Sequence, residues 1–115
     1  MLAGGVAVLL ASCSNSGTAL AEQACVHVDA SIRLFTQAEH ATSTATARRK
    51  ANQAIGQLEA ALPIAAQANS ADAAFNPLMT TLQEIGRTSE ANLIPALRAQ
   101  CAAASNPTGG SAPPG

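Results

Sequence analysis

Aromatic side chains and net charge are what this sequence has least of. Its 115 residues include two Phe, no Trp and no Tyr, and the formal net charge is −1. Single-stranded nucleic acids are bound by aromatic stacking and basic grooves, so nucleic acid is not expected as a partner. No apolar run reaches the ~18 residues that a membrane-spanning helix needs. Alanine is the commonest residue, with 28 copies, and its high helix propensity predicts an all-α fold.

Motifs of catalysis and metal binding are also missing. The sequence has no GxSxG, SxxK, CxxC or HxxxH and no Gly-rich phosphate loop. His27 and His40 are thirteen residues apart, about 140° apart around one helix, so they cannot bind one metal together. We therefore expect neither an enzyme nor a metal site. The glutamates are expected on different helices or at opposite ends, without a carboxylate pair: Glu39, Glu59, Glu84 and Glu90.

The N-terminal segment is apolar and ends at a cysteine. An apolar run from Leu2 to Ala11 is closed by Leu10-Ala11-Ser12-Cys13, which resembles the lipobox of bacterial lipoproteins. The resemblance implies a signal peptide over residues 1–12, a lipid on Cys13 as the sole cofactor, and anchoring to the outer face of the cell membrane. The run lacks a preceding Lys or Arg, so we expect the natural start upstream. A secreted protein, or a cytosolic protein with an apolar N-terminus, is the alternative.

Cysteine usage supports export. Three cysteines are an odd number for an exported protein. If Cys13 carries a lipid, Cys25 and Cys101 remain and can pair in an oxidising compartment. The expected organisation is then the lipidated Cys13 with a flexible tether over residues 13–18, a helical domain over 19–104, and a disordered Gly/Pro/Ser tail over 105–115.

Four apolar stripes with steps of three and four residues predict four helices. Their members are Cys25, Val28, Ile32 and Phe35; Ala51, Ile55, Leu58 and Leu62; Phe75, Leu78, Leu82 and Ile85; and Ile94, Leu97 and Cys101. Residues 42–44 offer an N-cap for the second helix, and Asn69-Ser70 followed by Asp72 offers a cap and a first-turn acid for the third. Gly86 can end the third helix in a left-handed turn, and Thr88 or Ser89 can cap the fourth.

Prolines complicate two of these helices. Pro63 and Pro95 lie inside the second and fourth stripes, and each is expected to kink or break its helix. Asn76-Pro77 is an alternative, later start for the third helix.

A small up-down four-helix bundle fits these features. Cys25 lies near the start of the first helix and Cys101 near the end of the last, and an even number of antiparallel helices brings those ends together. The core is thin, with 18 Leu, Ile, Val, Phe or Met residues between 19 and 104. A disulfide between these cysteines is therefore expected to add about 4 kcal/mol of stability.

Arg48-Arg49-Lys50 is the one run of like charge in the sequence. In the bundle it is expected, with Arg87, at the end away from the membrane, where these cations are a candidate contact for an anionic envelope polymer or a partner protein. The alternative is an ordinary solvated helix face, because acidic residues are expected near the same end.

Two further stretches carry a family resemblance. Ala61 to Ala66 (ALPIAA) and Ala96 to Cys101 (ALRAQC) resemble ALPxAA and ALxxQC stretches of small uncharacterised exported lipoproteins of actinobacteria. The resemblance implies an envelope lipoprotein with a helical domain and brings no known activity. The sequence thus predicts a non-catalytic structural or interaction module of the cell envelope. The alternative is a carrier for a small apolar ligand between the helices, which an enclosed pocket of several hundred Å³ would favour.

Overall fold

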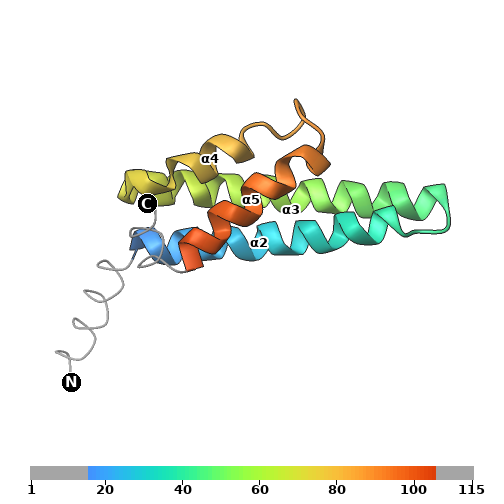
Figure 1. Ribbon diagram of the computed structural model, residues 1–115, viewed down its shortest axis with the longest axis horizontal. Helices are drawn as coiled ribbons and strands as arrows, with labels where there is room; N and C mark the ends of the chain where they lie inside the picture. The colour runs from blue at the N-terminus through green and yellow to red at the C-terminus, as the bar shows by residue number, and fades with distance from the viewer. Residues whose placement is uncertain (1–15, 106–115) are drawn as a thin grey trace, which may run out of the picture.

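The structure, a computed structural model, describes residues 16–105 and is α-helical over this range (Figure 1). The four predicted helices are present, so the all-α, four-helix prediction is confirmed. The elements are α2 (Ser16–Glu39), α3 (Thr44–Ala71), the short 3-10 helix η1 (Ala73–Phe75), α4 (Asn76–Leu82) and α5 (Glu90–Ser105). None of the helices in this range has the length and hydrophobicity of a membrane span.

The helices follow an up-down order but differ in length. α2 and α3 have 24 and 28 residues and form a long antiparallel hairpin, whereas α4 has 7 residues and α5 has 16. α4 packs against α3, and α5 packs against α2 and α4. The turn between α2 and α3 therefore projects beyond the shorter pair (Figure 1).

Small side chains form most of the interface between α2 and α3. The predicted second stripe is only partly correct: Leu58 is buried, but Ile55 is 37% exposed. Alanines take the buried positions instead, because small side chains let two helices pack closely along their whole length. The buried residues of the hairpin are Ala21, Ala24, Cys25, Val28, Ser31 and Ile32 on α2, and Ala54, Leu58, Ala61, Ala65 and Ala68 on α3.

Local signals explain most helix ends. Ser43 is the N-cap of α3 and its side chain accepts a hydrogen bond from Thr46 N at 3.1 Å. The N-cap expected at Asn69-Ser70 is not found there, since α3 continues to Ala71 and Asp72 instead caps η1. α4 begins at Asn76, the later of the two expected starts, and Pro77 lies in its first turn. Gly86 has a φ of 88° in the turns after α4, the left-handed conformation that glycine adopts without steric cost.

Neither internal proline ends its helix. Pro63 lies within α3 and Pro95 within α5, and both helices continue past them. Both prolines are exposed, as are Glu59 and Ala91, the residues four positions before them. The carbonyl groups that the prolines leave without a helical partner thus lie on the water-facing side, which limits the cost of each missing bond.

The start of α2 is part of the folded domain. α2 begins at Ser16, inside the segment expected to be a flexible tether. A Cβ on Gly17 would lie 3.3 Å from Asp72 Cβ and 3.4 Å from Ala71 Cβ, so glycine permits the close approach of α2 to the end of α3. At the other end, α5 includes Ser105. The rest of the predicted tether and tail, and the predicted signal peptide, lie outside the described residues.

Candidate functional site

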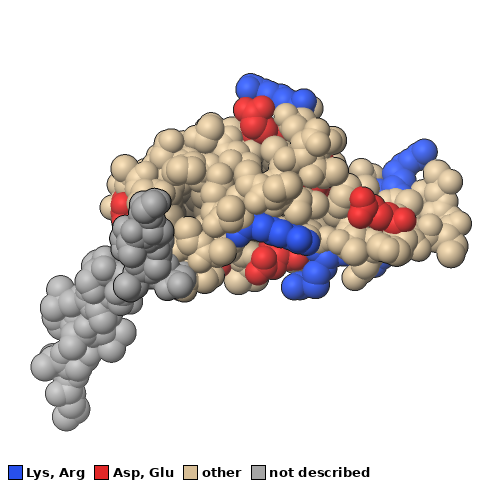
Figure 2. Space-filling model, in the orientation of Figure 1, with Lys and Arg blue, Asp and Glu red and all other residues tan. Residues whose placement is uncertain are grey.

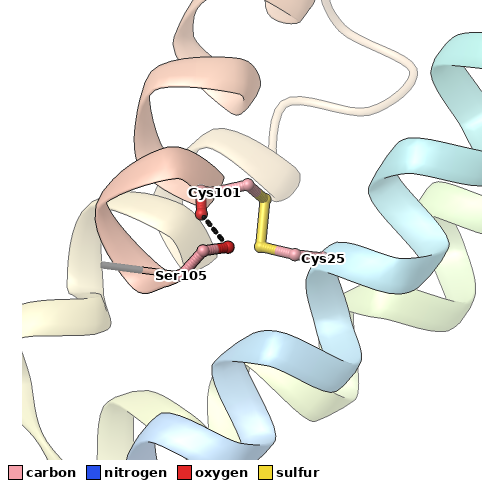
Figure 3. The surroundings of a disulfide bond; sticks show 3 residues. All are labelled: Cys25, Cys101 and Ser105. Carbon is pink, nitrogen blue, oxygen red and sulfur yellow. Dashed lines mark hydrogen bonds between the residues drawn. A yellow bond between two sulfur atoms is a disulfide. The ribbon is translucent and has the colours of Figure 1, made fainter. Parts of the chain in front are cut away.

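The Cys25–Cys101 disulfide joins α2 to α5 (Figure 3). The two Cα atoms are 5.6 Å apart, and the cysteines are 5% and 7% exposed. Ser105 Oγ donates a hydrogen bond to the carbonyl oxygen of Cys101 at 3.0 Å, which secures the last turn of α5. The predicted pairing is present, and the bond fixes the C-terminal half of α5 against α2.

The remaining cysteine, Cys13, lies outside the described residues. Its predicted lipidation therefore remains a prediction. Because α2 begins at Ser16, Cys13 precedes the first described helix by three residues.

The predicted basic cluster is divided between two places. Arg48 and Arg49 line a hollow of about 460 Å³ together with Ala45, Asn52 and Gln53, all on α3. Residues of a single helix wall this hollow, so it is an open helix surface. Lys50 is half-buried.

Arg87 belongs to a different hollow, between α3 and the connection from α4 to α5. The four predicted cations thus do not line either hollow together. On the face shown in Figure 2, acidic and basic side chains are interspersed without a patch of one sign. This distribution is what a solvated surface produces.

The two histidines are in separate environments. His27 is half-buried and its Nδ1 lies 2.8 Å from Gln57 Oε1 on α3. His40 is exposed and its Nδ1 lies 2.9 Å from the carbonyl oxygen of Thr36. Within residues 16–105, no three His, Cys, Asp or Glu side chains come together in a way that could hold a metal ion.

A buried acid, Glu90, was missed by the sequence analysis. It is the first residue of α5, is 9% exposed, and its Oε2 lies 2.7 Å from Ser31 Oγ on α2. Ser31 is fully buried and donates to the carbonyl oxygen of Ala54 on α3 at 2.7 Å. This small polar cluster therefore connects three helices across the core.

Burial raises the pKa of Glu90 above its ordinary value of 4.5, while a hydrogen bond donated by Ser31 to the ionised carboxylate acts in the opposite direction and is the smaller influence. The second carboxyl oxygen, Oε1, is buried and has no hydrogen-bond partner. The sequence did contain a signal: Glu90, Leu93 and Leu97 follow steps of three and four, which place the acid on the buried face of α5. Both leucines are buried.

Glu90 also lines the second hollow, which has a volume of about 280 Å³. Its apolar wall comes from Ile55, Leu58, Ile85 and Leu93. A third hollow, of about 270 Å³, lies beside the disulfide. The first hollow, of about 460 Å³, lies in the lower half of the range typical of ligand pockets, ≈ 300–1,000 Å³, and the other two lie just below that range.

Comparison with known proteins returned no relative: no protein-family model, no curated protein and no solved structure matches this chain.

Proposed function

We propose that this protein is a membrane-anchored extracytoplasmic lipoprotein whose helical domain is a non-catalytic structural or interaction module of the cell envelope. The observation that carries the proposal is the disulfide between Cys25 and Cys101. Disulfides form and persist mainly in oxidising compartments outside the cytoplasm. The pairing also leaves Cys13 as the unpaired cysteine, at the position where the lipobox resemblance requires a thiol.

The length of chain between the lipid and the domain supports a fixed placement on the membrane. Only Ser14 and Asn15 separate Cys13 from Ser16, the start of α2, and an extended chain spans at most about 3.5 Å for each of these three residue steps. The lipid would therefore hold the start of α2 within about 10 Å of the bilayer surface. The turn between α2 and α3, at the other end of a 24-residue helix, would be about 36 Å further along the helix axis.

This placement presents the start of α3 to other envelope components. Arg48 and Arg49 are exposed there and are the proposed contact for an anionic polymer or an envelope protein. Because Arg87 lines a different hollow, the proposed contact comprises the run on α3 without it.

The way the core is filled favours a module over a carrier. The facing surfaces of α2 and α3 consist largely of alanines with no exposed area, such as Ala24, Ala61 and Ala65, so the side chains leave little space between the helices. One observation favours the alternative, a carrier of a small apolar ligand: the hollow of about 280 Å³ beside Leu58 and Leu93.

Anchoring is tested by expressing the full chain, preceded by a complete signal peptide, in a bacterium that processes lipoproteins. We expect the protein in the membrane fraction, with a mature N-terminus at Cys13 that carries acyl chains by mass spectrometry. Cys13→Ala should leave the membrane fraction. Cys25→Ala is the matched control and should remain there, because its thiol is not the one that is acylated. A mature product that retains the residues before Cys13 would refute the proposal.

The contact is tested by a pull-down from intact envelopes. Replacing Arg48, Arg49 and Lys50 with alanine should reduce the recovery of envelope material, whereas Arg98→Ala, which removes an exposed cation elsewhere, should not. Undiminished recovery with the triple variant would remove the basic run from the proposal and leave the anchoring unaffected.

A further inference from the structure

Ser31 cannot make both of its hydrogen bonds if Glu90 is ionised. Ser31 Oγ lies 2.7 Å from the carbonyl oxygen of Ala54 and 2.7 Å from Glu90 Oε2. A hydroxyl has one proton to donate, a carbonyl oxygen can only accept, and an ionised carboxylate can only accept. With the hydroxyl proton directed to Ala54, the short contact to Glu90 requires a second proton.

We infer that Glu90 is held as a neutral carboxylic acid in the folded protein, and that its protonation closes a latch between α5 and the α2–α3 hairpin which opens when the acid ionises. In the closed latch the Glu90 O–H donates to Ser31 Oγ, and Ser31 donates to the carbonyl oxygen of Ala54. Loss of the proton leaves two acceptors competing for one hydroxyl proton. One buried oxygen then has no donor, which is unfavourable away from water.

The surroundings of Glu90 favour the neutral form. The side chain is 9% exposed and Oε1 is buried without a partner, an arrangement that would leave an ionised carboxylate poorly solvated. Its position at the start of α5 acts in the opposite direction, because a helix N-terminus stabilises negative charge. Burial raises the pKa of Glu90 and outweighs the opposing influence of the Ser31 hydrogen bond.

Few charged groups face the latch. Arg87, from the connection to α5, lines the hollow that Glu90 also lines. On α2 and α3 the titratable groups one helical turn before the latch residues are His27 and Lys50, both half-buried. α4 itself has no titratable side chain, and the turn that follows it carries the half-buried Glu84.

The disulfide restricts what can move when the latch opens. Cys101 fixes α5 to α2, eleven residues after Glu90, or about 16 Å along the helix. Opening is therefore confined to the connection at residues 83–89 and the first turns of α5. It would uncover Leu58 and Leu93, which are 1% and 6% exposed in the closed form. The latch thus makes exposure of an apolar surface on α3 and α5 dependent on pH.

Two measurements on the full-length oxidised chain test the latch. Carbon-13 NMR of labelled glutamate carboxyl groups should show Glu90 titrating above the ordinary 4.5. Hydrogen exchange of the backbone amides in the first turns of α5 is the second measurement. After correction for the intrinsic pH dependence of exchange, their protection should fall by up to about tenfold per pH unit between pH 4.5 and the raised pKa of Glu90.

Glu90→Gln and Glu59→Gln form the matched pair of variants. The glutamine at position 90 keeps an N–H that can donate to Ser31 Oγ and cannot ionise, so protection of α5 should no longer depend on pH. Glu59 is exposed on α3, and its replacement should leave the dependence unchanged. A Glu90 carboxyl that titrates at or below 4.5, or an equal loss of protection in Glu90→Gln, would overturn the inference. The carbon-13 titration of the unaltered chain decides the matter even if a variant does not fold.

Discussion

Reduction of the Cys25–Cys101 disulfide is expected to remove a large part of the stability of the domain. The cysteines are separated by 76 residues in the sequence, for which the chain-entropy model gives about 4.5 kcal/mol. A domain the size of residues 16–105 has a typical unfolding free energy of about 5–13 kcal/mol. In a domain of 60–100 residues each kcal/mol shifts Tm by about 4–8 °C. The reduced protein should therefore melt about 18–36 °C below the oxidised one.

The assay is a thermal melt followed by far-UV circular dichroism. Because both cysteines are buried, the reduced sample is prepared by unfolding in a phosphine reductant and refolding in its presence. Reduction leaves both sulfur atoms in place, so the measured change reports the loss of the cross-link without an added cavity. Cys13→Ala is the control and should not change the melt. A reduced protein that melts within a few degrees of the oxidised one would refute the reasoning.

The remaining predictions concern single positions, and urea titrations of the variants measure each free energy of unfolding. Ala61 is fully buried, so Ala61→Leu should cost about 1–3 kcal/mol by overpacking. Ala60 is exposed, so Ala60→Leu should change stability by less than about 0.5 kcal/mol. Equal effects of the two substitutions would contradict the close packing of alanines between α2 and α3. Gly86 has a φ of 88°, so Gly86→Ala should cost about 1–2 kcal/mol. Gly56 is helical with nothing within 4 Å of an added Cβ, so Gly56→Ala should raise the unfolding free energy by about 0.5–1 kcal/mol. If both glycine substitutions changed the unfolding free energy in the same direction, backbone conformation would not be the cause of the changes. Because the pKa of Glu90 is raised in the folded state, the stability that protonated Glu90 contributes is fully present below pH 4.5 and is lost as pH rises through the folded-state pKa. An unfolding free energy that instead rises with pH between these two pKa values, relative to Glu90→Gln, would contradict this prediction.

The helices and their connections were largely predictable because their signals are local. Ser43 caps α3 through its own side chain, and Gly86 adopts the left-handed conformation for which it was singled out. The disulfide pairing was predicted by assigning Cys13 to the lipid and pairing the two remaining cysteines, and the even number of antiparallel helices agreed with it because it brings Cys25 beside Cys101.

The buried surface of α3 was harder to predict because alanine carries little information about burial. Ala60 is exposed and Ala61 is fully buried, although both are alanine and have the same hydrophobicity. The larger Ile55 dominated the predicted stripe, yet it lies at the edge of the interface, since close packing of α2 against α3 selects small residues.

Glu90 was missed for a related reason. A glutamate at the start of a helix is usually exposed and stabilised by the helix dipole, so its residue type and position favour exposure, and only its spacing from Leu93 and Leu97 indicates burial. Its partner Ser31 is 59 residues away in the sequence, and a polar pair of this kind becomes visible only when the helices are packed. The step from Glu90 to Leu93 and Leu97 indicated the face but not the partner.

The disulfide also determines what a single proteolytic cut can do. The exposed turn at residues 42–43 and the exposed Gln83, Gly86 and Arg87 all lie inside the covalent loop between Cys25 and Cys101. A protease that cleaves once in either place adds one water molecule and releases no fragment. Two pieces would separate on a gel only after thiol reduction, so an intact band without reductant says nothing about the continuity of this backbone.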